Sequence, residues 1–232
     1  MIPLMHRLRT EIGAASLVEF GLALPIVFFL GAGGIEYANL GRSQLLVSQI
    51  ALNLADNASR VGLTSNLATT QLREADINDV LQAVRLQGNG IGIATNGRVT
   101  LSSLENIQQS YDKAPVQRIH WQRCIGLQSG ASYTSSYGSA PATAGIDATL
   151  GNAGTPTTGM GDTGYQVTAP SGAGVMFVEV NFNYQPMFSA MFIKNRQIHY
   201  TASFIVRDKR DFSQIFNPSP TAPRATCDLY TA

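Results

Sequence analysis

The stretch from Ala15 to Ile35, ASLVEFGLALPIVFFLGAGGI, decides the fold of this chain of 232 residues. At about 1.5 Å per residue it forms a helix about 30 Å long, which matches the hydrocarbon thickness of a bilayer. From Leu22 to Ile35 the stretch is uncharged, and the carboxylate of Glu19 stands alone near its start. The stretch therefore predicts a transmembrane helix over 15–35 with an acid at its entrance.

Glu19 is an expensive residue for such a helix. A carboxylate deep in hydrocarbon costs on the order of 2.5–3.5 kcal/mol, so ionisable residues there generally face a partner or mark a function. The alternative is that Glu19 lies close enough to the interface for its side chain to reach water. Composition alone does not decide between a functional Glu19 with a partner in the membrane and a Glu19 that reaches water at the interface.

Residues 1–14 form a short basic leader, in which Arg7 and Arg9 outnumber Glu11. Beyond the span the first charges are Glu36 and Arg42. Because basic flanks stay in the cytoplasm, the sequence predicts a single-pass protein of the cytoplasmic membrane with a cytoplasmic N-terminus and an extracytoplasmic C-terminal part.

A competing interpretation is an ordinary secretory signal. Residues 6–9 would be its basic region, residues 20–30 its apolar core and residues 31–33 its small-residue cleavage site. The chain would then be an exported binding domain, or a single-pass anchored one if the signal stays uncleaved. A glutamate at the start of the apolar core argues against this interpretation.

The residues Gly13-Ala14-Ala15-Ser16-Leu17-Val18-Glu19-Phe20, followed by Leu22, Leu24 and Pro25, resemble the processing region of TadE-like proteins. These are the minor pilins, or pseudopilins, of tight-adherence pili. The resemblance implies that an aspartyl prepilin peptidase removes the leader after a small residue. It also implies a glutamate as the fifth mature residue, followed by an aromatic residue, which are Glu19 and Phe20 here. A weaker resemblance covers the region from Tyr184 to Arg207.

The cleavage position departs from the family pattern. Counting back from Glu19 as the fifth residue makes Ala15 the new N-terminus and places Ala14 before the cut, where the family usually has glycine. A cut after Gly13 would make Glu19 the sixth residue, and a chain that is not processed is the third alternative.

The resemblance also implies partners and a location. Glu19 would neutralise the freed amine of an adjacent subunit inside the membrane and so set the axial stagger between helices. The expected partners are the prepilin peptidase, other pilin subunits, the inner-membrane assembly platform and the lipid bilayer, and the expected location is the inner membrane or the pilus.

Composition excludes one class of partner. Only 13% of the residues are charged and the formal net charge is +1, whereas about 25% charged residues is usual. A chain of this kind has no strong field to attract nucleic acid. We expect no nucleic-acid binding.

The two cysteines, Cys124 and Cys227, both follow the span. If the span exports them, an even pair in an oxidising compartment favours one disulfide. It would close a loop of about 100 residues and anchor the proline-rich C-terminal tail. Two buried free thiols are the alternative.

The rest of the chain predicts a pilin-like α+β fold. Residues 36–62 continue the span as an exposed stem helix that ends near Gly62, and residues 63–232 form the head. Thr64 or Ser65 caps a second helix that stops near Gly88. The expected strands are 98–104 and 116–125, then two alternating runs near 178–184 and 198–206 that pair with each other. The long N-terminal helix packs against this antiparallel sheet.

Residues 126–174 are rich in Gly, Ser, Thr and Ala, with Tyr133, Tyr137 and Tyr165 as sparse aromatics. This composition predicts a long surface loop or a partly disordered insertion with little core. Its tyrosines suit an adhesive or partner-contacting surface, and a solvated insertion without a ligand is the alternative.

We expect neither enzymatic activity nor a metal or cofactor. His120 and His199 lie on different strands, and the pair His120 and Cys124 lacks a third zinc ligand. No Gly-x-Ser-x-Gly elbow appears, and residues 88–92 form a turn without the lysine of a phosphate-binding loop.

Overall fold

Two units make up the chain in the computed structural model, which describes residues 12–62, 68–188, 191–194 and 196–232. The N-terminal unit comprises Met1–Arg42 and Pro186–Asn195, and the head unit comprises Ser43–Gln185 and Arg196–Ala232. Most of the leader, residues 1–11, lies outside the described residues.

The long N-terminal helix is α2, Ile12–Arg60, which continues through Pro25 without a break. From Ser43 onward it belongs to the head unit and buries one apolar face there. The buried apolar residues of this part are Val47, Ile50, Ala51, Leu54, Ala55 and Ala58. The helix ends at Arg60, and Gly62 follows with a φ of 151°, a conformation that side chains other than glycine rarely adopt.

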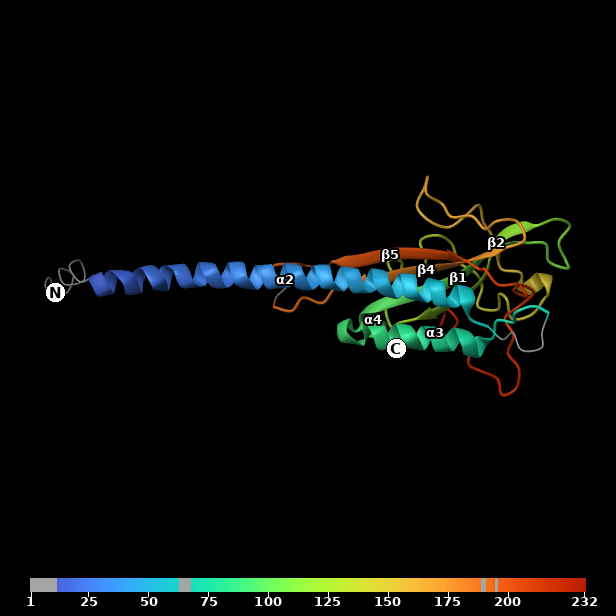
Figure 1. Cartoon of the computed structure of the whole chain (residues 1–232), viewed down its shortest axis with the longest axis horizontal. Helices are drawn as coiled ribbons and strands as arrows, with labels where there is room; N and C mark the ends of the chain where they lie inside the picture. The colour runs from blue at the N-terminus through green and yellow to red at the C-terminus, as the bar shows by residue number, and fades with distance from the viewer. Residues whose placement is uncertain (1–11, 63–67, 189–190, 195) are drawn as a thin grey trace. The chain divides into compact units, whose positions relative to one another are not determined.

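The head contains one antiparallel sheet (Figure 1). Its strands are β1 (Gly97–Ile107), β2 (Val116–Ile125), β3 (Thr155–Pro156), β4 (Gly174–Asn183) and β5 (Gln197–Ile205), in the spatial order β3-β2-β1-β4-β5. The two alternating runs pair as predicted, because β4 lies antiparallel to β5. The α+β fold, with a long N-terminal helix on an antiparallel sheet, is confirmed.

Helix α3, Glu74–Gly88, is the second predicted helix, but it starts later than expected. Thr64 and Ser65, the predicted caps, lie outside the described residues. The helix begins after Arg73, whose backbone N–H donates to the Asp76 carboxylate at 3.0 Å. This acid in the first turn satisfies a backbone donor in the manner of a capping box.

The described part of the head unit also contains three short elements. They are η1 (Asn89–Ile91), α4 (Ile93–Asn96) and η2 (Leu150–Asn152). The first two link α3 to β1, and the third lies in the long connection between β2 and β4.

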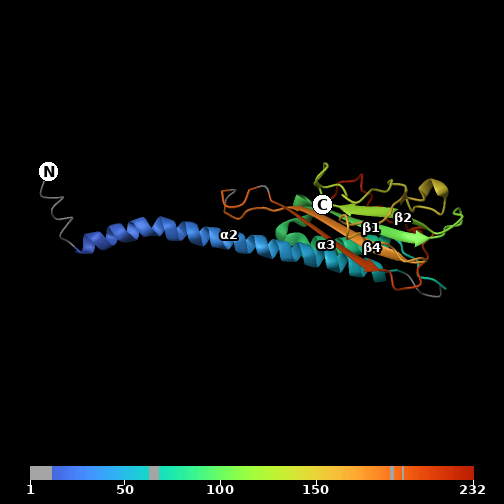
Figure 2. The same cartoon turned by 90° about the horizontal axis from the view of Figure 1, so that it is seen from above.

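Different layers cover the two faces of the sheet (Figure 2). On β1, Leu101 pairs with Arg123 of β2, and Arg123 bonds Glu74 of α3, so this face meets the helices. The connection over residues 126–173 covers the other face. Here Leu104, Ile119, Val175 and Phe177 of the sheet form a buried cluster with Met160 and Ala169 of the connection.

Residues 126–174 hold little core, as predicted, because most of them are exposed or half-buried and their buried apolar residues are Ala144, Met160 and Ala169. Strand β4 is buried on both faces. Glu179 and Asn181, on its polar face, are buried beneath the connection, and Glu179 accepts hydrogen bonds from the backbone N–H of Ser136 at 3.0 and 3.2 Å. Backbone donors from the connection thus replace water around this carboxylate.

A buried ion pair joins helix to sheet on the opposite face. Glu74 and Arg123 have side chains that are 0% exposed and form a bidentate pair, and Arg224 Nε lies 3.3 Å from Glu74 Oε1. Removing one member of such a pair leaves the other charge buried without compensation, which is strongly destabilising.

We therefore expect Glu74→Gln to lower the free energy of unfolding of the head by roughly 3 kcal/mol, measured by urea denaturation. Asp79→Asn is the matched control, because Asp79 lies exposed on the same helix. Equal stability of the two variants would show that the pair does not hold α3 to the sheet.

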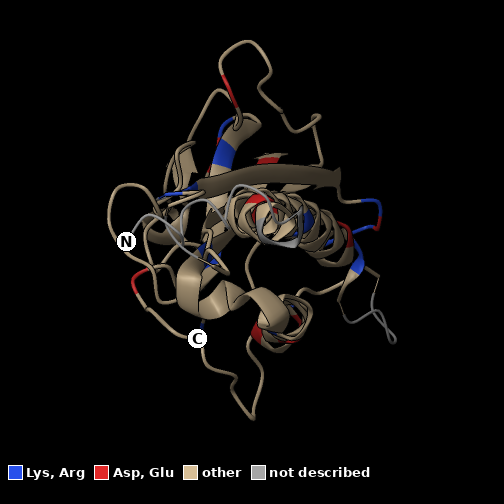
Figure 3. Cartoon of the chain, turned by 90° about the vertical axis from the view of Figure 1, so that its left-hand side faces the viewer, with Lys and Arg blue, Asp and Glu red and all other residues tan. Residues whose placement is uncertain are grey.

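Charged residues of both signs are dispersed around the ribbon in the view of Figure 3 rather than gathered on one face. This distribution agrees with the formal net charge of +1 for the whole chain. Attraction of a polyanion such as nucleic acid depends on a surface where positive charges gather. The view in Figure 3 shows positive and negative residues mixed instead.

Candidate functional site

The first part of α2 exposes apolar side chains on every side. A helix that is hydrophobic all round belongs in a membrane or between other helices, because water solvates it poorly. This helix is long and apolar enough to cross a membrane, and a signal sequence passes the same test of length and composition. The exposed large apolar residues are Leu17, Val18, Phe20, Leu22, Leu24, Ile26, Val27, Phe28, Phe29 and Leu30.

Glu19 lies exposed within this apolar surface, directly before Phe20, which is also exposed. In the part of the chain that the structure describes, Glu19 has no hydrogen-bond or ion-pair partner. Glu36, a second acid on the described part of this helix in the N-terminal unit, behaves differently. Glu36 is 0% exposed and accepts hydrogen bonds from the backbone N–H groups of Met187 and Phe188. Of these two helix acids, Glu19 is the one available to another molecule.

The predicted processing residues Gly13, Ala14 and Ala15 lie at the start of α2, which begins at Ile12. These residues are helical, and residues 1–11 on their N-terminal side lie outside the described part of the chain.

The spacing between the predicted new N-terminus and Glu19 is one helical turn. Ala15 and Glu19 are four residues apart on α2, which is a rise of about 6 Å. A freed amine at Ala15 would stand at the positive end of its own helix dipole, an unfavourable place for a cation, whereas a carboxylate in the first turn is favoured. The arrangement places a cation and an anion at two levels of one helix.

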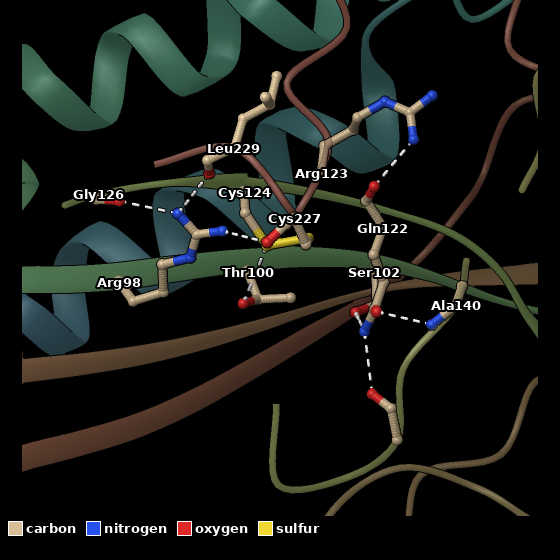
Figure 4. Close-up of a disulfide and its surroundings, with 11 residues drawn as sticks. Arg98, Thr100, Ser102, Gln122, Arg123, Cys124, Gly126, Ala140, Cys227 and Leu229 are labelled. Carbon is tan, nitrogen blue, oxygen red and sulfur yellow. Dashed lines mark hydrogen bonds between the residues drawn. A yellow bond between two sulfur atoms is a disulfide. The ribbon is translucent and has the colours of Figure 1, made fainter. Parts of the chain in front are cut away.

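A disulfide joins Cys124 of β2 to Cys227 of the C-terminal tail (Figure 4). The backbone supports the same attachment, because the N–H of Cys124 donates to the Ala225 carbonyl at 2.7 Å. Arg98 of β1 donates to three carbonyls, those of Gly126, Cys227 and Leu229, at 2.8, 2.6 and 2.8 Å. Burial lowers the pKa of Arg98. These contacts hold the tail on the sheet.

A cavity of about 250 Å³ lies beside the disulfide. The side chain of Arg98 borders it together with the rings of Tyr133 and Tyr230, and the Arg98 guanidinium stacks 4.4 Å from the centre of the Tyr230 ring. Gln122 closes another side, where its side-chain amide contacts Ser102 and Ala140 (Figure 4). The Arg98 hydrogen bonds all go to backbone carbonyls, which indicates a structural role.

A larger, polar groove of about 740 Å³ lies between the 126–173 connection and strands β4 and β5. A chain of hydrogen bonds lines it: the Tyr137 hydroxyl lies 2.8 Å from Asp162 Oδ1 and 3.1 Å from His199 Nε2, and His199 Nδ1 lies 2.7 Å from Asn181 Oδ1. Sequence reasoning placed His199 on a strand and Tyr137 in a loop but did not bring them together. Groups that alternate between donor and acceptor suit a polar ligand such as a sugar.

The Tyr137 hydroxyl gives this groove a measurable property. Burial, then the hydrogen bond to Asp162, raises its pKa to about 12. In the unfolded chain this hydroxyl ionises near its usual pKa of 10, and in the folded chain it stays neutral up to about 12. Its contribution to the stability of the fold is therefore fully present below pH 10 and is lost as the pH rises through about 12.

In a rapid pH jump that precedes unfolding, tyrosinate absorbance should show a component with its midpoint near 12. Tyr137→Phe should remove that component, whereas Tyr165→Phe, at an exposed site in the same connection, should leave it in place. A wild-type titration without this component would contradict the described hydrogen bonds.

A buried group of Ser103, Glu105 and His120 contains the residue types of a hydrolase but not the geometry. Ser103 Oγ donates to Glu105 Oε1 at 2.6 Å, and His120 Nδ1 lies 2.8 Å from Glu105 Oε2. A catalytic serine must instead donate to the histidine that acts as its base. Within residues 12–62, 68–188, 191–194 and 196–232, no group of three or more His, Cys, Asp or Glu residues is arranged to hold a metal ion.

The predicted disulfide between Cys124 and Cys227 is present, the roles of Glu19 and Phe20 stay predictions, and the contacts of Glu36 were not foreseen from the sequence. Glu36 directly follows the apolar stretch, which was the available signal, but its partners Met187 and Phe188 lie about 150 residues away and no local pattern names them.

Comparisons with protein-family models, with curated proteins and with solved structures find no match to this chain.

Proposed function

We propose that this protein is a minor pilin, or pseudopilin, of a tight-adherence pilus. It is inserted in the inner membrane through α2, processed by the prepilin peptidase and assembled with other pilin subunits by lateral packing of helices. In this role it supports pilus biogenesis and adhesion. The observation that carries the proposal is the exposed, unpaired position of Glu19 on the apolar part of α2 within the described residues.

Energetics support a partner for Glu19. An unpaired carboxylate inside a bilayer is costly, and so is the free α-ammonium group that processing creates. One ion pair between neighbouring subunits satisfies both groups and fixes the axial offset of the two helices. Its value lies in register as much as in stability, the role best attested for buried polar groups.

The two parts of α2 support the same proposal. Over residues 15–31 the helix exposes side chains on all sides, and from Ser43 onward it buries one face in the head. A pilin-type subunit needs both properties, because its first half contacts lipid or other helices while its second half carries the head. The lipid bilayer, other subunits and the assembly platform are thus the proposed partners.

The basic leader supports a cytoplasmic N-terminus, with Arg7 and Arg9 on the inner side and the head on the outer side. A disulfide between Cys124 and Cys227 is consistent with an oxidising compartment for the head. We assign no catalytic activity, cofactor or nucleic-acid partner to the protein.

The proposal is tested by sequencing the N-terminus of the protein purified from its own cells. A start at Ala15 or Ala14, dependent on the prepilin peptidase, is the expected result. A start near Gly33 or Gly34 would indicate a secretory signal instead, and a retained Met1 would indicate a plain membrane anchor.

The second candidate function is an exported or single-pass anchored binding domain with an ordinary signal sequence. The polar groove around Tyr137, Asp162 and His199 favours it, because a mature binding domain needs a site of this kind. The same N-terminal sequencing separates the two candidates. Only the binding-domain candidate predicts a mature chain that lacks Glu19.

A further inference from the structure

The connection between β4 and β5 carries an exposed apolar tip. Its residues 186–195 belong to the N-terminal unit rather than to the head from which both strands come. Met187, Phe188 and Met191 are 60%, 49% and 70% exposed. Three large apolar side chains exposed so close together in the sequence are unusual for a loop in water and mark an interaction surface.

Hydrogen bonds connect this tip to Glu36, the residue that directly follows the proposed span on α2. The Glu36 carboxylate accepts hydrogen bonds from the Met187 N–H at 3.0 and 3.2 Å and from the Phe188 N–H at 2.9 Å. The carboxylate is fully buried in this contact. Hydrogen bonds from backbone N–H groups to a carboxylate are among the stronger kinds, so the tip has a defined position along α2.

A second contact reaches further into the span. The ring of Phe192 packs on the ring of Phe29 with centroids 6.1 Å apart, and its edge approaches Gly33 so closely that an added Cβ there would lie 3.2 Å from Phe192 Cε1. The absence of a side chain at Gly33 makes room for the Phe192 ring.

These contacts give the tip a depth in the membrane. Phe29 precedes Ile35, the end of the expected span, by six residues, or about 9 Å along the helix. A ring that packs on Phe29 therefore lies inside the outer margin of the hydrocarbon core when the span occupies a bilayer. Met187, Phe188 and Met191, which are exposed, lie in the same short connection as Phe192.

Basic residues follow the apolar tip. Lys194 directly follows Ile193, Arg196 comes two residues later at the start of the returning head segment, and both are exposed. Apolar side chains followed by Lys and Arg are typical of segments that lie in the boundary between acyl chains and headgroups, where the cations reach the phosphates.

We propose that the described part of this connection, residues 186–188 and 191–194, is a second membrane-contacting element, which inserts Met187, Phe188 and Met191 into the outer boundary of the same bilayer that α2 crosses. The occupant of this apolar surface is lipid. This inference rests on the membrane insertion of α2 in the proposed function and adds a second contact that restrains the chain at the outer surface.

The test uses the full chain in phospholipid vesicles with one environment-sensitive fluorophore on an introduced cysteine. Cys124 and Cys227 are joined to each other, which leaves the introduced thiol as the labelled one. The test variant is Met191→Cys. Leu30→Cys reports the span and Tyr165→Cys reports the head, and both positions are exposed in the structure. Nitroxide-bearing lipids and aqueous iodide serve as quenchers.

We expect the label at 191 to be quenched by nitroxide lipids and protected from iodide, as at 30, whereas the label at 165 is quenched by iodide. If the label at 191 follows the one at 165 while the label at 30 is in lipid, the inference fails and the proposed span stands. A label at 30 in water would overturn both. Protection at 191 from both quenchers would mean a protein neighbour and would also overturn the inference.

Discussion

Glu19→Gln should abolish most incorporation of the protein into pili while leaving its amount in the membrane unchanged. Glutamine keeps the size of the side chain but removes the charge that we assign to the neighbouring α-ammonium group. Breaking a buried ion pair on one side costs about 3–5 kcal/mol, and each 1.4 kcal/mol is a tenfold change in an equilibrium. A loss of at least about tenfold in subunit incorporation follows, even if partial solvation halves the energy.

The measurement is quantitative immunoblotting of sheared pili and of membranes from the same cells. Glu19→Asp keeps the charge on a side chain shorter by one methylene and should retain more incorporation than Glu19→Gln. Asp79→Asn, an exposed acid on α3, should behave as the wild type. The thermal unfolding of the head should not change in the Gln variant, because Glu19 belongs to the N-terminal unit. Wild-type incorporation of the Gln variant would remove the assembly role of Glu19.

Removal of the disulfide is the second large effect. The bond closes a loop with a sequence separation of 103 residues between Cys124 and Cys227. In the chain-entropy model a loop of this size stabilises the folded state by about 4–5 kcal/mol. For a chain of 232 residues this corresponds to a fall in melting temperature of roughly 10–15 °C for the Cys124→Ser, Cys227→Ser double variant.

Local contacts add to this effect. The tail carbonyls of Cys227 and Leu229 accept hydrogen bonds from buried Arg98, and loss of the tail would leave that cation with fewer partners. Thermal unfolding followed by circular dichroism, with and without reductant, measures the change. The reduced wild type should match the double variant. A melting temperature that does not respond to reduction would show that the tail contributes nothing to the head.

The secondary structure was largely predictable because its signals are local. The strand 116–125 and the alternating residues of β4 and β5 follow the period of two that a pleated strand imposes. The start of α3 was not predictable from capping residues alone, because the acid that satisfies the first turn, Asp76, lies inside the helix and acts together with Arg73.

The connection 126–173 shows where composition misleads. Glycine and small polar residues predict disorder, but here they permit a close approach to the sheet. Gly154 has a φ of 78°, and a Cβ at this position would lie 2.2 Å from the Ile119 carbonyl oxygen. Gly138 likewise has a φ of 114°, and a Cβ there would lie 2.9 Å from Ile119 Cδ1. Side chains at these positions would push the layer away from β2, so the low content of bulky residues reflects packing.

The residues of the candidate sites also differ in how far the local sequence can name them. Glu19 and Phe20 are proposed from a short local motif, and their role stays a prediction. The partners of Glu36 and the groove residues Tyr137 and His199 could not be predicted in this way, since long-range pairing across the sheet brings them together. Local sequence patterns report the elements, and tertiary packing decides which polar groups meet.

The most direct test of the ion pair is a membrane-permeant carbodiimide reaction on pili or membranes assembled from equal amounts of nitrogen-15-labelled and unlabelled chains, followed by mass spectrometry. The account predicts an amide bond between Glu19 of one chain and the α-amine of Ala15, or of Ala14, of another, seen as peptide pairs of mixed isotope. N-terminal peptides that still begin with Met1, or cross-links confined to a single isotopic form, would contradict it.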